Sequence, residues 1–178
     1  MLGVAVGVFA WLAVQSHREA GLGRTANAAP PPMRHIPPER IALLAHFEPP
    51  EYDASDNAGG SPDFRASMEH YRKGDYAGAV SGVRAAVQAE PQSVEPRFYL
   101  AICLLLTHDR PAAVQLLKDV TAAGNTPYLE SARFYLAKAL LSEGNLAGAD
   151  LQLRIIVEMH GKLEKQAQVL HAQIIPRP

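Results

Sequence analysis

Side chains capable of acid–base or metal chemistry are spread thinly along this sequence. Its seven histidines stand at positions 17, 35, 46, 70, 108, 160 and 171. No two of them have the i, i+4 spacing that places two imidazoles on one helix face for a shared metal ion. Four acidic residues, Glu48, Glu51, Asp53 and Asp56, lie in a proline-rich stretch, where a carboxylate pair lacks the fixed geometry of acid–base catalysis. They therefore indicate solvated charge.

Nucleophilic and phosphate-binding motifs are also missing. Cys103 is the single cysteine, which excludes an internal disulfide and a cysteine-based zinc site. Its apolar neighbours predict a buried structural thiol. The sequence contains no G-x-x-x-x-G-K-[ST], G-x-G-x-x-G, H-E-x-x-H or G-x-S-x-G motif. We therefore expect no enzymatic activity, no metal and no cofactor.

Composition favours packed helices and argues against nucleic acid as a direct partner. The 17 Lys and Arg residues nearly balance the 18 Asp and Glu residues, and no stretch carries the basic excess that phosphate binding requires. Hydrophobic residues make up 48% of the chain and aromatic residues only 7%. Because alanine and leucine dominate the apolar fraction, we expect an all-α protein.

The chain opens with an apolar run, MLGVAVGVFAWLAV, and its first charged residue is Arg18. As a helix this run would be roughly 21–24 Å long, against a hydrocarbon core of about 30 Å. We expect residues 1–16 to be a membrane anchor helix, with Trp11 at an interface. Three alternatives stay open: a signal peptide cleaved at Ala26-Asn27-Ala28, a span that begins upstream of Met1, and a helix buried in a soluble core.

The side of the membrane is a separate expectation. Arg18, Arg24 and Arg34 follow the apolar run, and by the positive-inside rule they would leave the rest of the chain in the cytoplasm. That argument loses its force if residues precede Met1. We expect a single-pass protein with its C-terminal part in the periplasm, the alternatives being the cytoplasmic side or export after signal cleavage.

Residues 17–61 have the composition of a Pro/Ala-rich linker. Eight of the 14 prolines lie between Pro30 and Pro62. Proline removes a backbone donor and prevents helix continuation, so we expect this stretch to be extended and mostly unpacked. One interruption, residues 39–47 (ERIALLAHF), has the composition for two turns of helix and could dock elsewhere on the protein.

The remaining residues contain an internal repeat. The run RFYLA at residues 97–101 recurs at 133–137, 36 residues later, and Phe64 stands 34 residues before Phe98. A second marker has the same spacing. Its three copies are Gly74-Asp75-Tyr76, His108-Asp109-Arg110 and Gly144-Asn145-Leu146, followed by Ala79, Ala113 and Ala149. Two markers in step indicate repeated structural units.

This pattern resembles the tetratricopeptide repeat, a helix–turn–helix unit of about 34 residues, over residues 60–160. The resemblance departs at His108, which replaces a turn glycine, and at Arg97 and Arg133, which replace the family's common tryptophan. We expect helix pairs at 62–73 with 76–89, 94–106 with 110–122 and 128–142 with 146–159. A last helix, Lys162–Ile174, would cap the open end of the stack, completing a domain over residues 62–175.

In the resembled fold the first helix of each repeat lines a concave groove, which implies the candidate partner-binding residues. They are Arg65, Met68, Tyr71 and Arg72 in the first repeat, Tyr99, Ile102 and Leu106 in the second, and Tyr135, Lys138 and Ser142 in the third. Aromatic, aliphatic and basic groups together suit an extended or helical peptide with some acidic side chains.

We therefore expect an adaptor, tethered to the membrane by its first helix, that binds a protein or peptide partner. The alternative comes from the layout of span, linker and repeats, which resembles the distal part of bacterial anti-sigma-type membrane proteins that carry a zinc-binding domain upstream. This chain lacks that domain, so the alternative applies to a protein whose start lies before Met1. The oligomeric state stays open.

Overall fold

The structure is a computed structural model that describes residues 36–52 and 61–175. Within these ranges the regular secondary structure is entirely helical, as predicted. No helix in the two ranges has both the length and the apolar character needed to cross a membrane. The anchor helix predicted over residues 1–16 lies outside the described residues.

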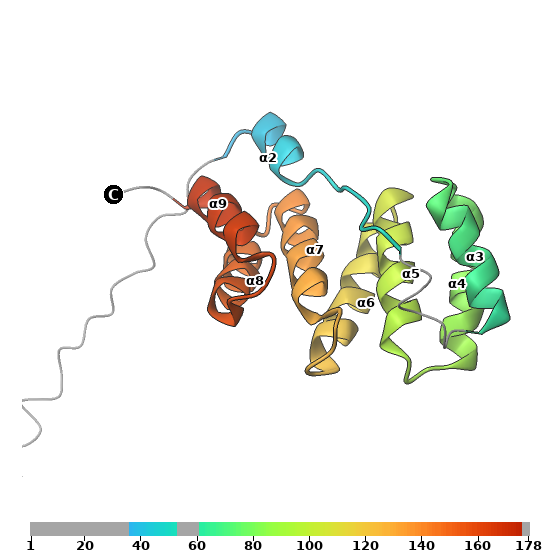
Figure 1. Cartoon of the computed structure of the whole chain (residues 1–178). Coiled ribbons are helices and arrows are strands. Elements are labelled where there is room, and N and C mark those ends of the chain that lie inside the picture. The colour runs from blue at the N-terminus through green and yellow to red at the C-terminus, as the bar shows by residue number, and fades with distance from the viewer. Residues whose placement is uncertain (1–35, 53–60, 176–178) are drawn as a thin grey trace, which may run out of the picture. The chain divides into compact units, whose positions relative to one another are not determined.

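Three helix pairs and one further helix follow the predicted boundaries closely (Figure 1). The pairs are α3 (Pro62–Arg72) with α4 (Tyr76–Ala89), α5 (Val94–Leu106) with α6 (Arg110–Ala122), and α7 (Leu129–Ser142) with α8 (Leu146–Met159). Each helix packs against the next along the chain, and α5 also contacts α7. The last helix, α9 (Glu164–Ile174), packs on α8 through the buried Ala167, Leu170 and Ile174. It thus covers the apolar end of the last repeat.

The turn inside each pair closes in the same way, including the one where histidine replaces glycine. Gly74, His108 and Gly144 have φ angles of 78°, 69° and 76°. In each turn the next residue donates its N–H to a carbonyl five residues back, as Asp109 does to Leu104 at 2.8 Å. A left-handed residue after the last helical turn is the usual way to satisfy the final carbonyls of a helix. His108 therefore adopts a conformation that costs a residue with a β-carbon about 1 kcal/mol.

Small residues set the spacing of the helices. Ala79, Ala113 and Ala149 are fully buried at the start of each second helix. In the first pair, a β-carbon added at Gly82 would collide with the hydroxyl of Ser67, which donates to the Asp63 carbonyl at 2.8 Å. Gly82 therefore leaves the space that the Ser67 hydroxyl occupies between α3 and α4.

Residues 36–52 pack against the repeats. The sequence allows this for the short helix at residues 39–47 but predicts that the linker around it is mostly unpacked. A short helix, α2 (Pro38–Leu44), contacts α7 and is flanked by the buried side chains of Ile36 and Ala45. It begins one residue before the predicted 39–47 and ends three residues before its end, and the Ala45 N–H donates to the Ile41 carbonyl at 2.8 Å. Residues 46–52 then continue without helix or strand, and in Figure 1 they cross from α2 over α7 and α5.

Candidate functional site

The first helices of the three repeats present hydrogen-bond donors to the backbone of residues 46–52. We call this side of α3, α5 and α7 the inner face, and we call residues 46–52 the extended segment. From α7, Lys138 Nζ donates to the His46 carbonyl at 2.6 Å and the Tyr135 hydroxyl donates to the Glu48 carbonyl at 2.6 Å. The other two donors are the Tyr99 hydroxyl on α5, 3.4 Å from the Glu51 carbonyl, and the Tyr71 hydroxyl on α3, 2.7 Å from the Pro50 carbonyl.

The extended segment needs these donors because it forms no helix or strand of its own. Backbone carbonyls that pack on an apolar surface must find partners, since a buried carbonyl without one costs free energy. The inner face supplies side-chain donors in place of backbone N–H groups. The donors of the inner face therefore follow the path of the segment's backbone.

The side chains of the segment divide into two sets. Phe47, Pro50 and Tyr52 are half-buried, and Phe47 and Tyr52 pack against the core. Glu48 and Glu51 are exposed. The apolar side chains therefore hold the segment on the protein, while its carboxylates face solvent.

Tyr52 inserts into a group of aromatic rings on the inner face. Its ring meets Tyr99 edge-on at 5.2 Å between centroids and Phe64 edge-on at 6.1 Å. The Tyr99 ring also lies 5.3 Å from Tyr71 and 5.3 Å from Phe98. Edge-to-face pairs of this kind are each worth about 0.5–1.5 kcal/mol beyond the area they bury.

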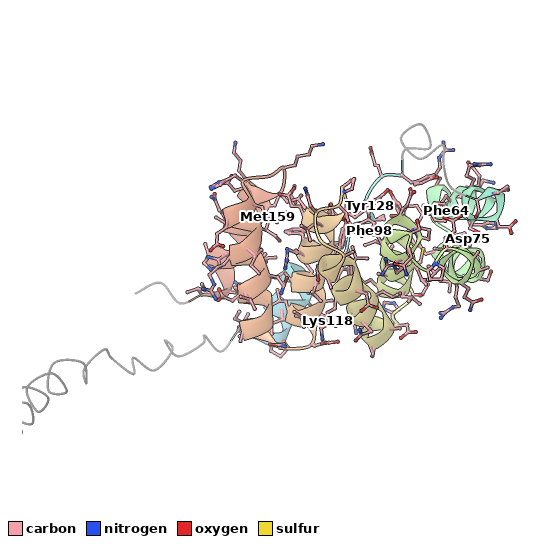
Figure 2. All side chains as sticks on the ribbon, turned by 90° about the horizontal axis from the view of Figure 1, so that it is seen from below. Phe64, Asp75, Phe98, Lys118, Tyr128 and Met159 are labelled. Atoms are coloured by element: carbon pink, nitrogen blue, oxygen red, sulfur yellow. The ribbon has the colours of Figure 1, made fainter. Side chains whose placement is uncertain are left out.

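The same aromatic group extends into the third repeat. Phe98 lies 5.0 Å from Tyr128, and Figure 2 shows these two residues next to each other. Lys118 on α6 lies away from them in the same view and is exposed. Aromatic contacts thus run from Tyr52 to the start of α7.

Burial sets the protonation of the donors. It raises the pKa of the Tyr71, Tyr99 and Tyr135 hydroxyls above their usual range, so all three remain donors at neutral pH. Burial also lowers the pKa of Lys138, an effect that the nearby Glu48 carboxylate opposes. The Lys138 ammonium lies 5.2 Å from the centre of the Phe134 ring, a cation–π distance.

Four of the ten candidates inferred from the repeat resemblance meet on the extended segment: Tyr71, Tyr99, Tyr135 and Lys138. Met68 and Ile102 are 0% and 1% exposed, so they belong to the core and present no accessible surface. They occupy the position in their repeats that Lys138 has in the third, since the spacings are again 34 and 36 residues. The longer lysine reaches the rim of the core, whereas methionine and isoleucine stay within it.

The other candidates lie around the segment on α3, α5 and α7. Arg65 is exposed on α3, and Arg72 pairs with Glu69 at 3.0 Å. Arg72 also lines a hollow of about 500 Å³ beside Pro50 and Tyr52. Leu106 and Ser142 line a second hollow beside Phe47.

The sequence analysis allows docking for residues 39–47, which include the first two residues of the segment, but it missed residues 48–52. The available sign was the pair of aromatic residues, Phe47 and Tyr52, in an otherwise polar and proline-rich stretch. Such residues lower the solubility of a linker and favour packing against a folded domain.

Chemistry beyond binding has little support in the described ranges. No three His, Cys, Asp or Glu side chains there come close enough together to hold a metal ion. Cys103 is fully buried, as predicted, and burial raises its pKa to about 12. A thiol in that state is inert towards nucleophilic chemistry.

Comparison with known proteins agrees with the geometry. A tetratricopeptide repeat model matches residues 70–133. No curated protein matches the chain in sequence. Solved structures that share the fold include the type III secretion translocator chaperone SycD of Yersinia enterocolitica, at 18% identity and a TM-score of 0.59 over 75% of this chain and 90% of that one.

A second structure of SycD, in complex with a peptide of the translocator YopD, has 16% identity and a TM-score of 0.58 over 70% of this chain and 94% of that one. These matches concern the helical repeats and give no support to the anti-sigma-type layout. The described part of the chain therefore has a tetratricopeptide-repeat-like fold, with an extended peptide segment of its own on the inner face.

Proposed function

We propose that this chain is a protein-interaction scaffold that holds an extended segment of a partner protein on its inner face. The observation that carries the proposal is the set of four donors, from three helices, on four backbone carbonyls of residues 46–52. Donors directed at carbonyls select an extended backbone, and the flanking apolar contacts add preference for particular side chains. Such a face suits an unfolded stretch of another protein.

The fold supports this proposal. Tetratricopeptide-repeat-like stacks offer a continuous surface built from the first helix of each repeat. SycD, which shares the fold, has been solved with a bound peptide of another protein. In the present chain, a peptide would meet tyrosine hydroxyls and the Lys138 ammonium on that surface.

The predicted apolar helix over residues 1–16 adds a location to the proposal. We propose that it tethers the repeats to a membrane, with the repeats on the periplasmic side. Membrane fractionation of the full chain and of a chain lacking residues 1–16 tests this part by itself. Recovery of both forms in the soluble fraction would exclude the tether.

Peptide binding is tested with a full-length variant whose extended segment can no longer occupy the inner face. In the open-face variant, residues 46–52 are replaced by glycine and serine at the same length. The probe is a fluorescein-labelled peptide with the sequence of residues 45–53, and fluorescence anisotropy reports its binding. Saturable binding is expected.

Two further changes in the open-face background locate the binding. Tyr135→Phe with Lys138→Met removes two donors, one of them charged, and should weaken binding by about tenfold or more. Lys118→Met, an exposed lysine on α6, should leave binding unchanged. A helical open-face variant that fails to bind the probe would overturn the proposed function.

A further inference from the structure

We propose that the extended segment is a built-in competitor that keeps the inner face closed until a partner segment of the same chemistry displaces it. The proposal rests on the proposed function, because a face that bound no partner would have nothing to regulate. It goes further by assigning a regulatory role to residues 46–52 and a chemical class to the partner.

Occupancy is the first argument. All four donors of the inner face that contact the segment, Tyr71, Tyr99, Tyr135 and Lys138, are engaged by its carbonyls. An incoming peptide needs the same donors, and Tyr52 fills the space beside the rings of Tyr99 and Phe64. The chain's own segment and a partner segment therefore exclude each other.

Connectivity is the second argument. Upstream, α2 is fixed to α7 next to the buried Ile36 and Ala45. Downstream, the eight residues 53–60 lead from Tyr52 to Ser61, which caps α3 by accepting from the Phe64 N–H at 3.2 Å. Binding of the segment is thus intramolecular, with an effective concentration on the order of millimolar. A partner with equal contacts must overcome that advantage.

The contacts also allow release. The segment's anchors, Phe47, Pro50 and Tyr52, are only half-buried, whereas the large side chains between the repeats are fully buried. The Tyr99 hydroxyl lies 3.4 Å from the Glu51 carbonyl oxygen, which makes this a long hydrogen bond. A stretch with few buried apolar contacts opens locally at a lower free energy than the helical stack unfolds. The segment can therefore leave while the repeats stay folded.

The residues of the extended segment indicate the chemistry of a partner that could displace it. A partner segment would be extended and would contain proline, with large apolar or aromatic side chains five residues apart, as Phe47 and Tyr52 are. Acidic residues fit between them, because Glu48 and Glu51 face solvent and Glu48 lies close enough to Lys138 to oppose the fall in its pKa. We assign the partner to this class: an unfolded, proline-containing protein segment with aromatic ends and acidic residues between them.

Displacement is tested with the same labelled peptide of residues 45–53. The native chain should bind it at least about tenfold more weakly than the open-face variant, because the tethered segment competes. Phe47→Ala with Tyr52→Ala, which removes the anchors and leaves the donors in place, should recover most of that affinity. Glu51→Gln changes an exposed side chain of the same segment and should bind like the native chain.

Release itself has a second readout. A nitroxide placed through Glu48→Cys reports on the segment, because the native thiol of Cys103 is fully buried. Its line shape should be that of an immobilised label in the free protein and should narrow when unlabelled peptide is added to saturation. The peptide of residues 45–53 with Phe47→Ala and Tyr52→Ala, at the same concentration, should leave the spectrum unchanged.

The outcomes separate the two proposals. If native and open-face chains bind the peptide equally, the competitor role is overturned and the proposed function stands. If neither binds, both are overturned. If the peptide binds without narrowing the nitroxide spectrum, the segment is not displaced and the competitor role fails. A native affinity that changes with protein concentration would show that the segment occupies a second copy, which also overturns the intramolecular claim.

Discussion

The Lys138 ammonium nitrogen lies 2.6 Å from the carbonyl oxygen of His46, a residue 92 positions earlier in the chain. The contact joins the third repeat to the point where α2 gives way to the extended segment. It depends on Lys138 being in a register position that the first two repeats fill with the buried Met68 and Ile102. A single polar residue among apolar equivalents thus marks where the extended segment begins on the repeats.

Replacing that lysine should release the segment without unfolding the stack. Lys138→Met keeps an unbranched side chain that is one atom shorter, and it removes a charged hydrogen bond worth about 1.5–3 kcal/mol. The burial that lowers the Lys138 pKa indicates a desolvation cost that offsets part of this value. We expect chymotrypsin to cut after Phe47 and Tyr52 several times faster in the variant, as followed by mass spectrometry, with unchanged helical circular dichroism.

The matched control for this prediction is Lys118→Met, which removes an exposed lysine from α6. It should leave both cleavage rates at the native value. Equal cleavage of the native chain and Lys138→Met would show that the Lys138–His46 contact does not hold the segment.

Most of the helical stack could be predicted from the sequence, because its determinants are local or periodic. The markers around Phe98 and Phe134 fix the repeat length, and the side chains of Asp75 and Asn145 each accept the N–H three residues on, which sets the start of α4 and α8. The turn at His108, which departs from the family pattern, still closes as the glycine turns do. Tertiary packing of the repeats outweighs the local cost there.

The position of residues 46–52 could not be predicted in the same way. Their prolines correctly indicate an extended conformation, but their bonds to the repeats use backbone carbonyls, which every residue carries. On the other side, Tyr99 and Tyr135 share a repeat position and Tyr71 does not. No sequence periodicity therefore links the donors to the segment, and only the fold brings the two sets together.

The half-buried carboxyl of Glu95 gives stability a pH dependence. Burial raises the pKa of Glu95, while a hydrogen bond from Tyr128 partly offsets this. Because the folded pKa lies above the unfolded one, the stability contributed by protonated Glu95 is complete below the unfolded pKa and is lost as pH rises through the folded value. Glu95→Gln should therefore raise Tm at pH 7 by about 1–3 °C and by much less at pH 4.

Calorimetry at both pH values measures this difference directly. Glu158→Gln, which neutralises an exposed glutamate on α8, is the matched control and should show little change in either condition. A Glu95→Gln variant that is less stable than the native chain at pH 7 would mean that the ionised carboxylate is well solvated in the folded protein.

The left-handed turn residue offers a test of backbone strain. His108 has a φ of 69° in the position that glycine holds in the other two turns. His108→Gly should raise stability by about 0.5–1 kcal/mol, because relief of the β-carbon clash exceeds the extra freedom gained by the unfolded chain. The opposite change, Gly144→Ala at a φ of 76°, should lower it by a similar amount. Urea unfolding measures both, and a loss of stability in His108→Gly would contradict the strain argument.

Glu130, on α7 of the third repeat, holds the start of the capping helix α9 through hydrogen bonds. Its carboxylate oxygens accept from the backbone N–H groups of Lys162 at 3.1 Å and Leu163 at 2.8 Å, just before α9 begins. These donors have no partner within the helix, and the N-cap residue Leu163 has no polar side chain to bind them. An acidic group at a helix N-terminus also interacts favourably with the helix dipole.

Removing this carboxylate should loosen α9 first. Glu130→Ala should cost about 1–2 kcal/mol and speed hydrogen exchange at Lys162, Leu163 and the first turn of α9. Gly161→Ala should act in the same direction, because a β-carbon there would collide with the carboxylate. Glu143→Ala, at an exposed position after α7, serves as the control and should leave exchange in α9 unchanged.

Since α9 covers the apolar end of the stack, exchange in α8 should rise next, whereas α3 at the far end should keep its native protection. Uniform acceleration from α3 to α9 would instead mean that the stack unfolds as one cooperative unit and that Glu130 has no local role.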